Sequence, residues 1–269
     1  MKTKLIVTLL SISAILSSNA FAVTFNDGGT HNIDYTIEHI VQWEDPDTGV
    51  PLDEPIIIQE GCLYIDRDAP GMHTTVNLLA GGHIISGELK IQNQGCLNMY
   101  SGASVNWADV DVSGSGTFNM YGGSVSPWTV LVKDSGTTNI YNGSVAELLT
   151  DYVSSAKIMG GVFSDIHSFR NSKIDIYGGK FNTNLASVNS STITLYGSFN
   201  LAYGTYTCTA PLNGNYDTRY LTGTLASGET TTNLQCLTFT GSHLVLAPVP
   251  EPATILLLTL GGLILRKKH

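Results

Sequence analysis

The stretch Phe118-Asn119-Met120-Tyr121-Gly122-Gly123 decides the fold, because close variants of it recur along the middle of the chain. The variants are Leu97-Asn98-Met99-Tyr100-Ser101-Gly102, Thr138-Asn139-Ile140-Tyr141-Asn142-Gly143, Ala156-Lys157-Ile158-Met159-Gly160-Gly161, Ile174-Asp175-Ile176-Tyr177-Gly178-Gly179 and Ile193-Thr194-Leu195-Tyr196-Gly197-Ser198. Val76 to Gly82 is an earlier member, one step upstream. The regular spacing of these units is the sequence signature of a solenoid.

Each unit alternates apolar and polar residues, which is the period of a β-strand. No helical periodicity of useful length occurs between the two chain ends. We therefore predict an all-β fold, a single-stranded parallel β-helix with about 18 to 21 residues per rung. One column of residues points inward and forms an aliphatic ladder in the core: Met99, Met120, Ile140, Ile158, Ile176 and Leu195.

The next outward column of the repeat is aromatic. It contains Tyr100, Tyr121, Tyr141, Tyr177 and Tyr196, with Met159 between the third and the fourth. Two interpretations remain open for this outward ladder: stacked rings that stabilise the solenoid, or a strip that lies against the sugar rings of a polysaccharide. The glycine pairs that follow predict corners with positive φ, and Asn142 is expected to tolerate that conformation where it replaces glycine.

Both chain ends carry targeting patterns. Residues 1–22 combine Lys2 and Lys4, an apolar stretch, and the small-x-small site Ala20-Phe21-Ala22, which together are typical of a secretory signal peptide. At the other end, Val249, Pro250, Glu251 and Pro252 precede an apolar run of 13 residues and the basic cluster Arg266, Lys267 and Lys268. The run would be about 20 Å long as a helix, short for a bilayer, and the cluster marks a cytoplasmic end.

This tail resembles the PEP-CTERM sorting domain of Gram-negative bacterial surface proteins, in which a Pro-Glu-Pro motif, a short apolar helix and a basic terminus occur in the same order. The resemblance implies an exosortase, a membrane transpeptidase of the cysteine type, as the partner that cleaves near Glu251. It also implies export, anchoring in the membrane during sorting, and a final place at the cell surface or outside the cell. A plain membrane anchor or a buried terminal helix is the alternative.

These patterns divide the chain into five parts. We expect a signal peptide at 1–22, an N-terminal cap with the first rung or rungs at 23–75, and β-helix repeats at 76–202. A capping β segment at 203–248 and the sorting signal with its short transmembrane helix at 249–269 complete the chain. Solenoids need such caps, because their terminal repeats would otherwise expose the core.

Charge and motifs exclude several function classes. Without the five basic residues near its two ends, Lys2, Lys4, Arg266, Lys267 and Lys268, the chain retains 8 basic residues against 22 acidic ones, a net charge of about −14 that disfavours nucleic acid as a partner. No nucleotide fingerprint, zinc motif or cofactor motif is found, so we expect no metal and no cofactor. Asp109 and Asp111 share one strand face about 6.5 to 7 Å apart, a spacing compatible with paired catalytic carboxylates, although acids on an exposed strand are more often only solvated.

The four cysteines of an exported chain favour disulfide bonds. Three connectivities are open for Cys62, Cys96, Cys208 and Cys236, and we favour 62 with 96 and 208 with 236 because neighbours in a solenoid are close in sequence.

These observations predict an exported, non-enzymatic β-helix protein with a structural or adhesive role at the cell surface or in the extracellular matrix, sorted by an exosortase through its tail. The alternative is a β-helix protein that binds or degrades polysaccharide, with an extracellular polysaccharide as its partner.

Overall fold

The computed structural model describes residues 23–38, 42–44, 51–56, 62–66, 73–208 and 216–249. The predicted signal peptide and all but Val249 of the predicted sorting signal lie outside these residues, so both remain predictions. Within the described part of the chain, no helix has the length and apolar character needed to span a membrane.

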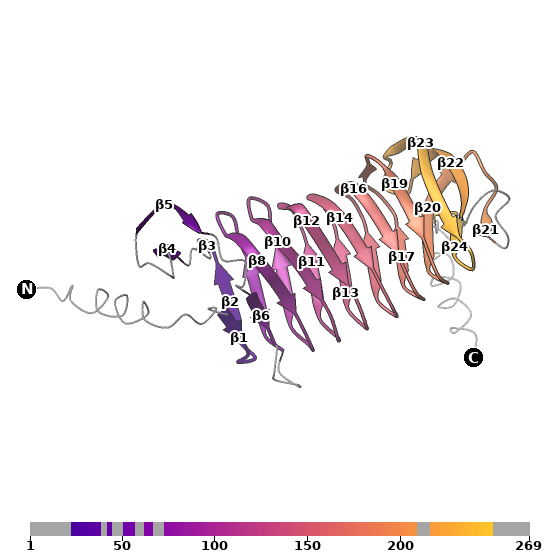
Figure 1. Ribbon diagram of the computed structural model, residues 1–269. Coiled ribbons are helices and arrows are strands. Elements are labelled where there is room, and N and C mark those ends of the chain that lie inside the picture. The colour runs from indigo at the N-terminus through magenta and orange to yellow at the C-terminus, as the bar shows by residue number, and fades with distance from the viewer. Residues whose placement is uncertain are drawn as a thin grey trace, which may run out of the picture.

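All regular elements of the described residues are strands, and they form a parallel β-solenoid of about six turns (Figure 1). This confirms the predicted all-β solenoid. The strands are β1 (Val23–Phe25), β2 (Thr30–Ile33), β3 (Thr36–Glu38), β4 (Gln42–Glu44), β5 (Pro51–Ile56), β6 (Cys62–Ile65), β7 (Thr75–Leu78), β8 (His83–Ile91), β9 (Cys96–Met99), β10 (Ser104–Val112), β11 (Thr117–Met120), β12 (Ser124–Val132), β13 (Thr137–Ile140), β14 (Ser144–Thr150), β15 (Ser155–Ile158), β16 (Val162–Ser168), β17 (Lys173–Ile176), β18 (Lys180–Phe181), β19 (Asn184–Ser187), β20 (Thr192–Phe199), β21 (Gly204–Thr207), β22 (Tyr216–Leu225), β23 (Thr230–Phe239) and β24 (His243–Ala247).

The strands stack in three columns, which we call the faces of the solenoid. The B face contains β2, β7, β9, β11, β13, β15, β17, β20 and β24, each parallel to the next. The long strands β8, β10, β12, β14 and β16 each cross two faces: their first residues form the A1 face, and their last residues form the A2 face. Six complete rungs result: rung 1 (β7, β8), rung 2 (β9, β10), rung 3 (β11, β12), rung 4 (β13, β14), rung 5 (β15, β16) and rung 6 (β17, β18, β19).

Rungs 1 to 3 are longer than rungs 4 and 5, and most of the difference lies at one corner. On the B face, Met99 pairs with Met120 one rung on, whereas Ile140 pairs with Ile158, so the step between rungs shortens along the axis. In rung 3, four residues separate the inward Val125 and Val130 at the turn from A1 to A2, whereas two separate Val145 and Leu148 in rung 4. We call this turn the A corner, and its two additional residues account for the length of rung 3. Rungs 1 and 2 have one further residue between the B and A1 faces.

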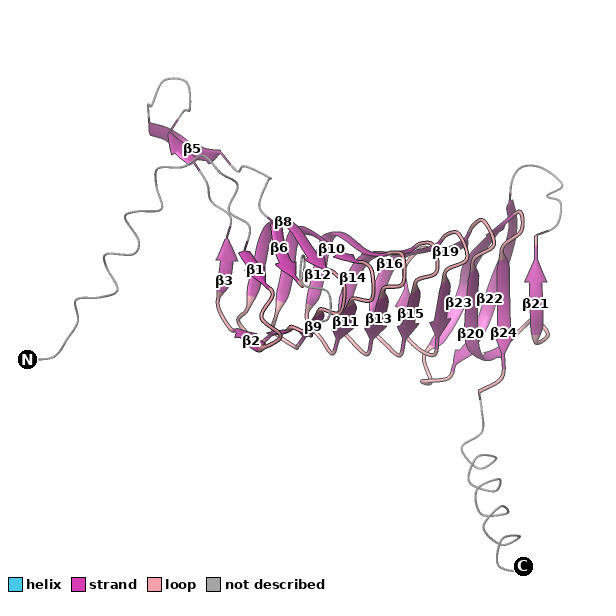
Figure 2. Cartoon of the chain, turned by 90° about the horizontal axis from the view of Figure 1, so that it is seen from below, coloured by secondary structure: helices cyan, strands magenta, loops and turns pink. Residues whose placement is uncertain are grey.

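The core runs along the whole solenoid axis, and successive rungs lie side by side in Figure 2. The predicted aliphatic ladder is confirmed: Met99, Met120, Ile140, Ile158, Ile176 and Leu195 are fully buried. A second inward column of the B face lies two residues earlier in each strand, with Phe118 as its largest member. Burying such side chains contributes about 1.5 to 3 kcal/mol each, so the core supplies the main stabilisation of the fold.

The glycine corners follow the B face. The second glycine of each pair has positive φ, as predicted: Gly123, Gly143, Gly161 and Gly179. The interpretation of Asn142 is wrong, because the left-handed residue of that corner is Gly143, and Asn142 occupies the position of the first glycine. The first position accepts a side chain in Asn142 and Ser101, but at Gly178 close approach requires glycine, since a Cβ there would collide with the backbone oxygen of Met159.

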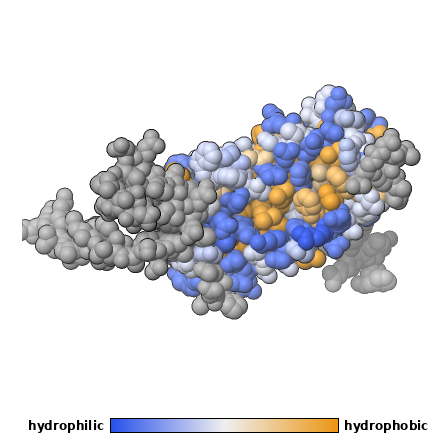
Figure 3. Space-filling view, viewed as in Figure 1, coloured by the Kyte–Doolittle hydropathy of each residue, from blue (hydrophilic) through white to orange (hydrophobic). Residues whose placement is uncertain are grey.

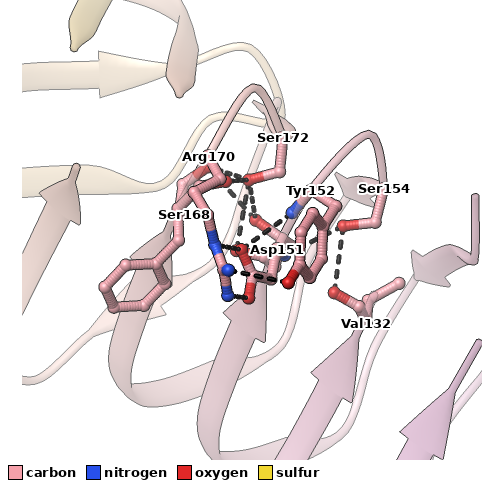
Figure 4. A network of polar contacts seen from close by, with 9 residues as sticks. Val132, Asp151, Tyr152, Ser154, Ser168, Arg170 and Ser172 are labelled. Carbon is pink, nitrogen blue, oxygen red and sulfur yellow. Dashed lines mark hydrogen bonds and ion pairs between the residues drawn. The ribbon is translucent and has the colours of Figure 1, made fainter. Parts of the chain in front are cut away.

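Buried hydroxyl groups form hydrogen bonds with backbone carbonyls at the corner between the A2 and B faces. Ser172 shares hydrogen bonds with the hydroxyls of Thr150 and Ser168 and donates to the carbonyl of Phe169, and Ser154 donates to the carbonyl of Val132 over 2.9 Å (Figure 4). Outside this cluster, the guanidinium of Arg170 lies 3.9 Å from the ring centroid of Tyr152 and binds the carboxylate of Asp151. Asp151 raises the pKa of Arg170, but this exposed ion pair is worth little stability.

The two ends of the solenoid differ. At the N-terminal end, β2, β3 and β6 stack on rung 1, and the chain between β3 and β6 includes the antiparallel pair β4 and β5. At the C-terminal end the chain changes direction: β22 runs antiparallel to β23, and β21 runs antiparallel to β24. The antiparallel strands end both sheets, which is how a solenoid protects its last parallel edge.

Candidate functional site

The outward side of the B face carries three regular columns, one for each outward residue of its strands. The middle column begins with five asparagines, Asn32, Asn77, Asn98, Asn119 and Asn139, one per rung. From Asn77 on, each side-chain amide donates to the side-chain oxygen of the asparagine one rung earlier, over 2.9 Å. The hydrogen bonds between neighbouring rungs therefore occupy many of the side-chain donors and acceptors of this column.

The aromatic column lies beside the asparagines and is stacked. The ring centroids of Tyr100 and Tyr121 are 5.3 Å apart, those of Tyr121 and Tyr141 are 5.0 Å apart, and those of Tyr177 and Tyr196 are 4.2 Å apart. Met159 separates the triplet from the pair, and the ammonium group of Lys157 lies 5.2 Å from the ring centroid of Tyr177.

This stacking favours the structural interpretation of the tyrosines over the sugar-binding one. Sugar rings pack against the face of an aromatic ring, and the facing sides within the triplet and the pair already cover each other. Burial raises the pKa of Tyr121, with a further contribution from Tyr141 and Tyr100. Burial and the hydroxyl of Tyr177 raise the pKa of Tyr196 to about 12. The geometry supports a structural ladder that presents ring edges to the solvent.

The acidic candidates lie on the outward side of the A2 face. Asp109 and Asp111 share this side, in agreement with the period of two. A carboxylate oxygen of Asp109 accepts a hydrogen bond from the backbone amide of Thr129 over 3.0 Å. Asp111 pairs with Lys133 at 2.7 Å. Both acids thus bind the next rung, and this arrangement ties successive rungs together.

The space-filling view shows hydrophobic residues over the middle of the visible surface, between hydrophilic margins (Figure 3). On the A2 face, Leu131 and Leu149 occupy outward positions of rungs 3 and 4 and are partly exposed. Among the side chains that the structure describes, the largest exposed apolar ones lie elsewhere, at the A corner, where Trp107 and Trp128 extend from rungs 2 and 3.

Sequence reasoning missed this tryptophan pair, because the recurring segments of the repeat contain neither Trp107 nor Trp128. The signal was present in the repeat lengths, since the two rungs that hold the tryptophans are longer than the rungs that follow them. Additional residues in a solenoid rung form a loop on one face, which is often the binding face.

The predicted disulfides are wrong for the cysteines whose side chains the structure describes. Cys96, Cys208 and Cys236 are free thiols. Cys62 and Cys96 have similar sequence surroundings, but Cys62 lies on the A2 face and Cys96 on the B face. Cys236 belongs to the A2 column, whereas Cys208 follows β21 at the end of the B face, so sequence proximity does not bring either pair together.

The free thiols lead to a first prediction. Burial raises the pKa of Cys236 to about 12, and Cys208 is also buried, so neither should react with iodoacetamide at pH 8 while the protein is folded. After unfolding in urea without a reductant, Cys96, Cys208 and Cys236 should all be labelled, as located by peptide mass spectrometry. Labelling of these three residues only after reduction would show that they form disulfides.

Within the described ranges, no group of three His, Cys, Asp or Glu side chains is placed to hold a metal ion. No family model, curated protein or solved structure matches the chain.

Proposed function

We propose that the chain is an exported structural or adhesive protein of a Gram-negative cell surface or extracellular matrix, sorted by an exosortase through residues 249–269. The observation that carries the proposal is the order of the tail: Val249-Pro250-Glu251-Pro252, an apolar run of 13 residues, and Arg266-Lys267-Lys268. The signal-peptide pattern at 1–22 supports it, because a chain that begins with such a pattern enters the export pathway.

The solenoid suits a structural role for a physical reason. Its outward polar groups join neighbouring rungs, as in the asparagine ladder and in the contact of Asp109 with Thr129. Such regular surfaces keep a rod rigid and soluble over its full length. The same engagement of Asp109 and Asp111 favours a scaffold over a polysaccharide-degrading enzyme, since both carboxylates already serve as links between rungs.

The sorting proposal predicts processing that depends on Glu251. In wild-type cells, the intact mass should fall by about the mass of the tail, and the product should reach the surface or the medium. In Glu251→Ala, uncleaved protein should remain in the membrane fraction. Asp134→Asn, which changes one exposed acid of the solenoid, is the control and should be processed normally. An unprocessed chain in wild-type cells would leave the tail as a plain anchor and contradict the proposal.

A further inference from the structure

The solenoid has two sets of exposed aromatic side chains, which differ in whether their rings stack on one another. In the tyrosine ladder the rings stack on one another, so the ring faces between them are covered. At the A corner, Trp107 and Trp128 are 62% and 46% exposed. Among the described residues, neither indole stacks on another ring or lies under a cation. Both indoles are therefore accessible to a ligand.

Two local features of the chain distinguish this corner: additional residues and an unusual backbone conformation. The additional residues fall within 106–108 in rung 2 and 126–128 in rung 3, between register pairs that match on both sides of the turn. Trp107 also has a φ of +58°, a left-handed conformation that is unusual for a bulky side chain. An unfavourable backbone that presents an aromatic ring to the solvent is a feature that folding alone does not require.

The third tryptophan of the chain comes from the connection between the same two faces two rungs before that of Trp107. The chain passes from β3 on the A1 face to β6 on the A2 face through a segment that contains β4 and β5. Trp43 lies in β4. All three tryptophans thus belong to segments that connect the A1 face with the A2 face, two of them in the neighbouring rungs 2 and 3.

Polar groups border the indoles on both sides. On the A1 side, the amide of Asn106 donates to the hydroxyl of Ser104 over 2.9 Å. On the A2 side, Thr129 donates through its hydroxyl to the carboxylate of Glu147 over 2.9 Å. The corner therefore combines accessible indoles with amide, hydroxyl and carboxylate groups. The outward column that contains Thr129 continues along the axis, one residue per rung, as Glu88, Asp109, Thr129, Glu147 and Asp165.

We propose that the A corner of rungs 2 and 3 binds a polysaccharide chain of neutral or N-acetylated sugars, which lies along the solenoid axis across Trp107 and Trp128. The apolar C–H face of a pyranose packs on an indole, and its hydroxyls bond to amide and carboxylate groups. Neutral polysaccharides would then be the ligands through which the protein adheres. The proposal therefore rests on the adhesive role proposed above.

The charge of the corner selects among ligands. The acidic column repels uronate and sulfate groups, so anionic polysaccharides fit poorly. A cationic ligand would be recognised best inside a cage of several aromatic rings. Among the described residues neither indole lies against another aromatic ring, so no such cage is present there, and the carboxylates of Asp109 and Glu147 already accept hydrogen bonds from Thr129. These features favour a flat sugar chain over a basic peptide.

The test is co-sedimentation of the full-length chain with insoluble chitin and cellulose. Calcium alginate beads serve as the anionic polysaccharide, and polylysine beads as the cationic probe. The wild type should bind chitin, cellulose or both, and it should not bind alginate. Trp107→Ala and Trp128→Ala should each weaken binding about tenfold, and the double variant should abolish it. Tyr220→Ala removes an aromatic side chain that is 56% exposed in the C-terminal cap, and it should bind like the wild type.

A further variant separates binding from stability. Trp107→Gly removes the indole and relieves the left-handed backbone, so it should melt no lower than the wild type and still lose binding. The proposal is overturned if no neutral polysaccharide binds, if binding survives the double variant, or if only polylysine is retained. A chain that is processed normally at its tail but fails these assays would refute this site alone and leave the sorting proposal standing.

Discussion

Replacing Gly123 with alanine is expected to lower the free energy of unfolding by about 3 to 5 kcal/mol, because two penalties combine at this corner. Gly123 has a φ of +88°, which a residue with a Cβ adopts only with strain. The added Cβ would also lie 2.5 Å from the backbone oxygen of Ala103 and 2.9 Å from the methyl carbon of Met99. A backbone atom of the preceding rung cannot move away without disturbing the stacking of the strands.

Urea unfolding followed by circular dichroism measures this effect, and Gly228→Ala is the matched control. Gly228 has a φ of +98°, but a Cβ added there meets no atom within 4 Å. The free energy of unfolding of the control should therefore fall only by the cost of the left-handed conformation, about 1 to 2 kcal/mol. If the two variants lost equal stability, close approach between rungs would not be the reason for glycine at position 123.

The inward ladder could be predicted from sequence because a solenoid repeats one local rule. Once Met99, Met120 and Ile140 recur at the same position of alternating segments, parallel stacking buries all of them in one column. The stacked tyrosines follow from the same reasoning, since outward residues of one register must lie one rung apart. Local period and repeat length thus determine which residues face the core.

The features that sequence reasoning missed depend on where each rung turns. Cys62 and Cys96 both follow a glycine and precede a leucine, but they lie on different faces because each rung contains three faces. Asn142 resembles a glycine in the aligned repeats, while the positive φ falls on the next residue. The tryptophans at the A corner occur within insertions, and an alignment on the recurring segments treats insertions as variation in length.

Replacing Phe118 with alanine is expected to cost about 3 to 5 kcal/mol, comparable to the loss at Gly123. Phe118 is fully buried, and its register neighbours are Leu97 in rung 2 and Thr138 in rung 4. The smaller side chain at Thr138 leaves the aromatic ring to fill the core between these rungs. Truncation would create a cavity that the rigid strand stacking cannot close.

The control for Phe118 is Thr117→Ala on the outward side of the same strand, which should change stability by no more than about 0.5 kcal/mol. Hydrogen exchange then localises the effect. Because each rung contacts mainly its neighbours, the amides of β9, β11 and β13 should lose protection first, while those of the antiparallel pair β22 and β23 should keep theirs. A uniform loss of protection along the chain would show instead that the solenoid and its cap unfold as one cooperative unit, and that stability in this rod is not divided among its rungs.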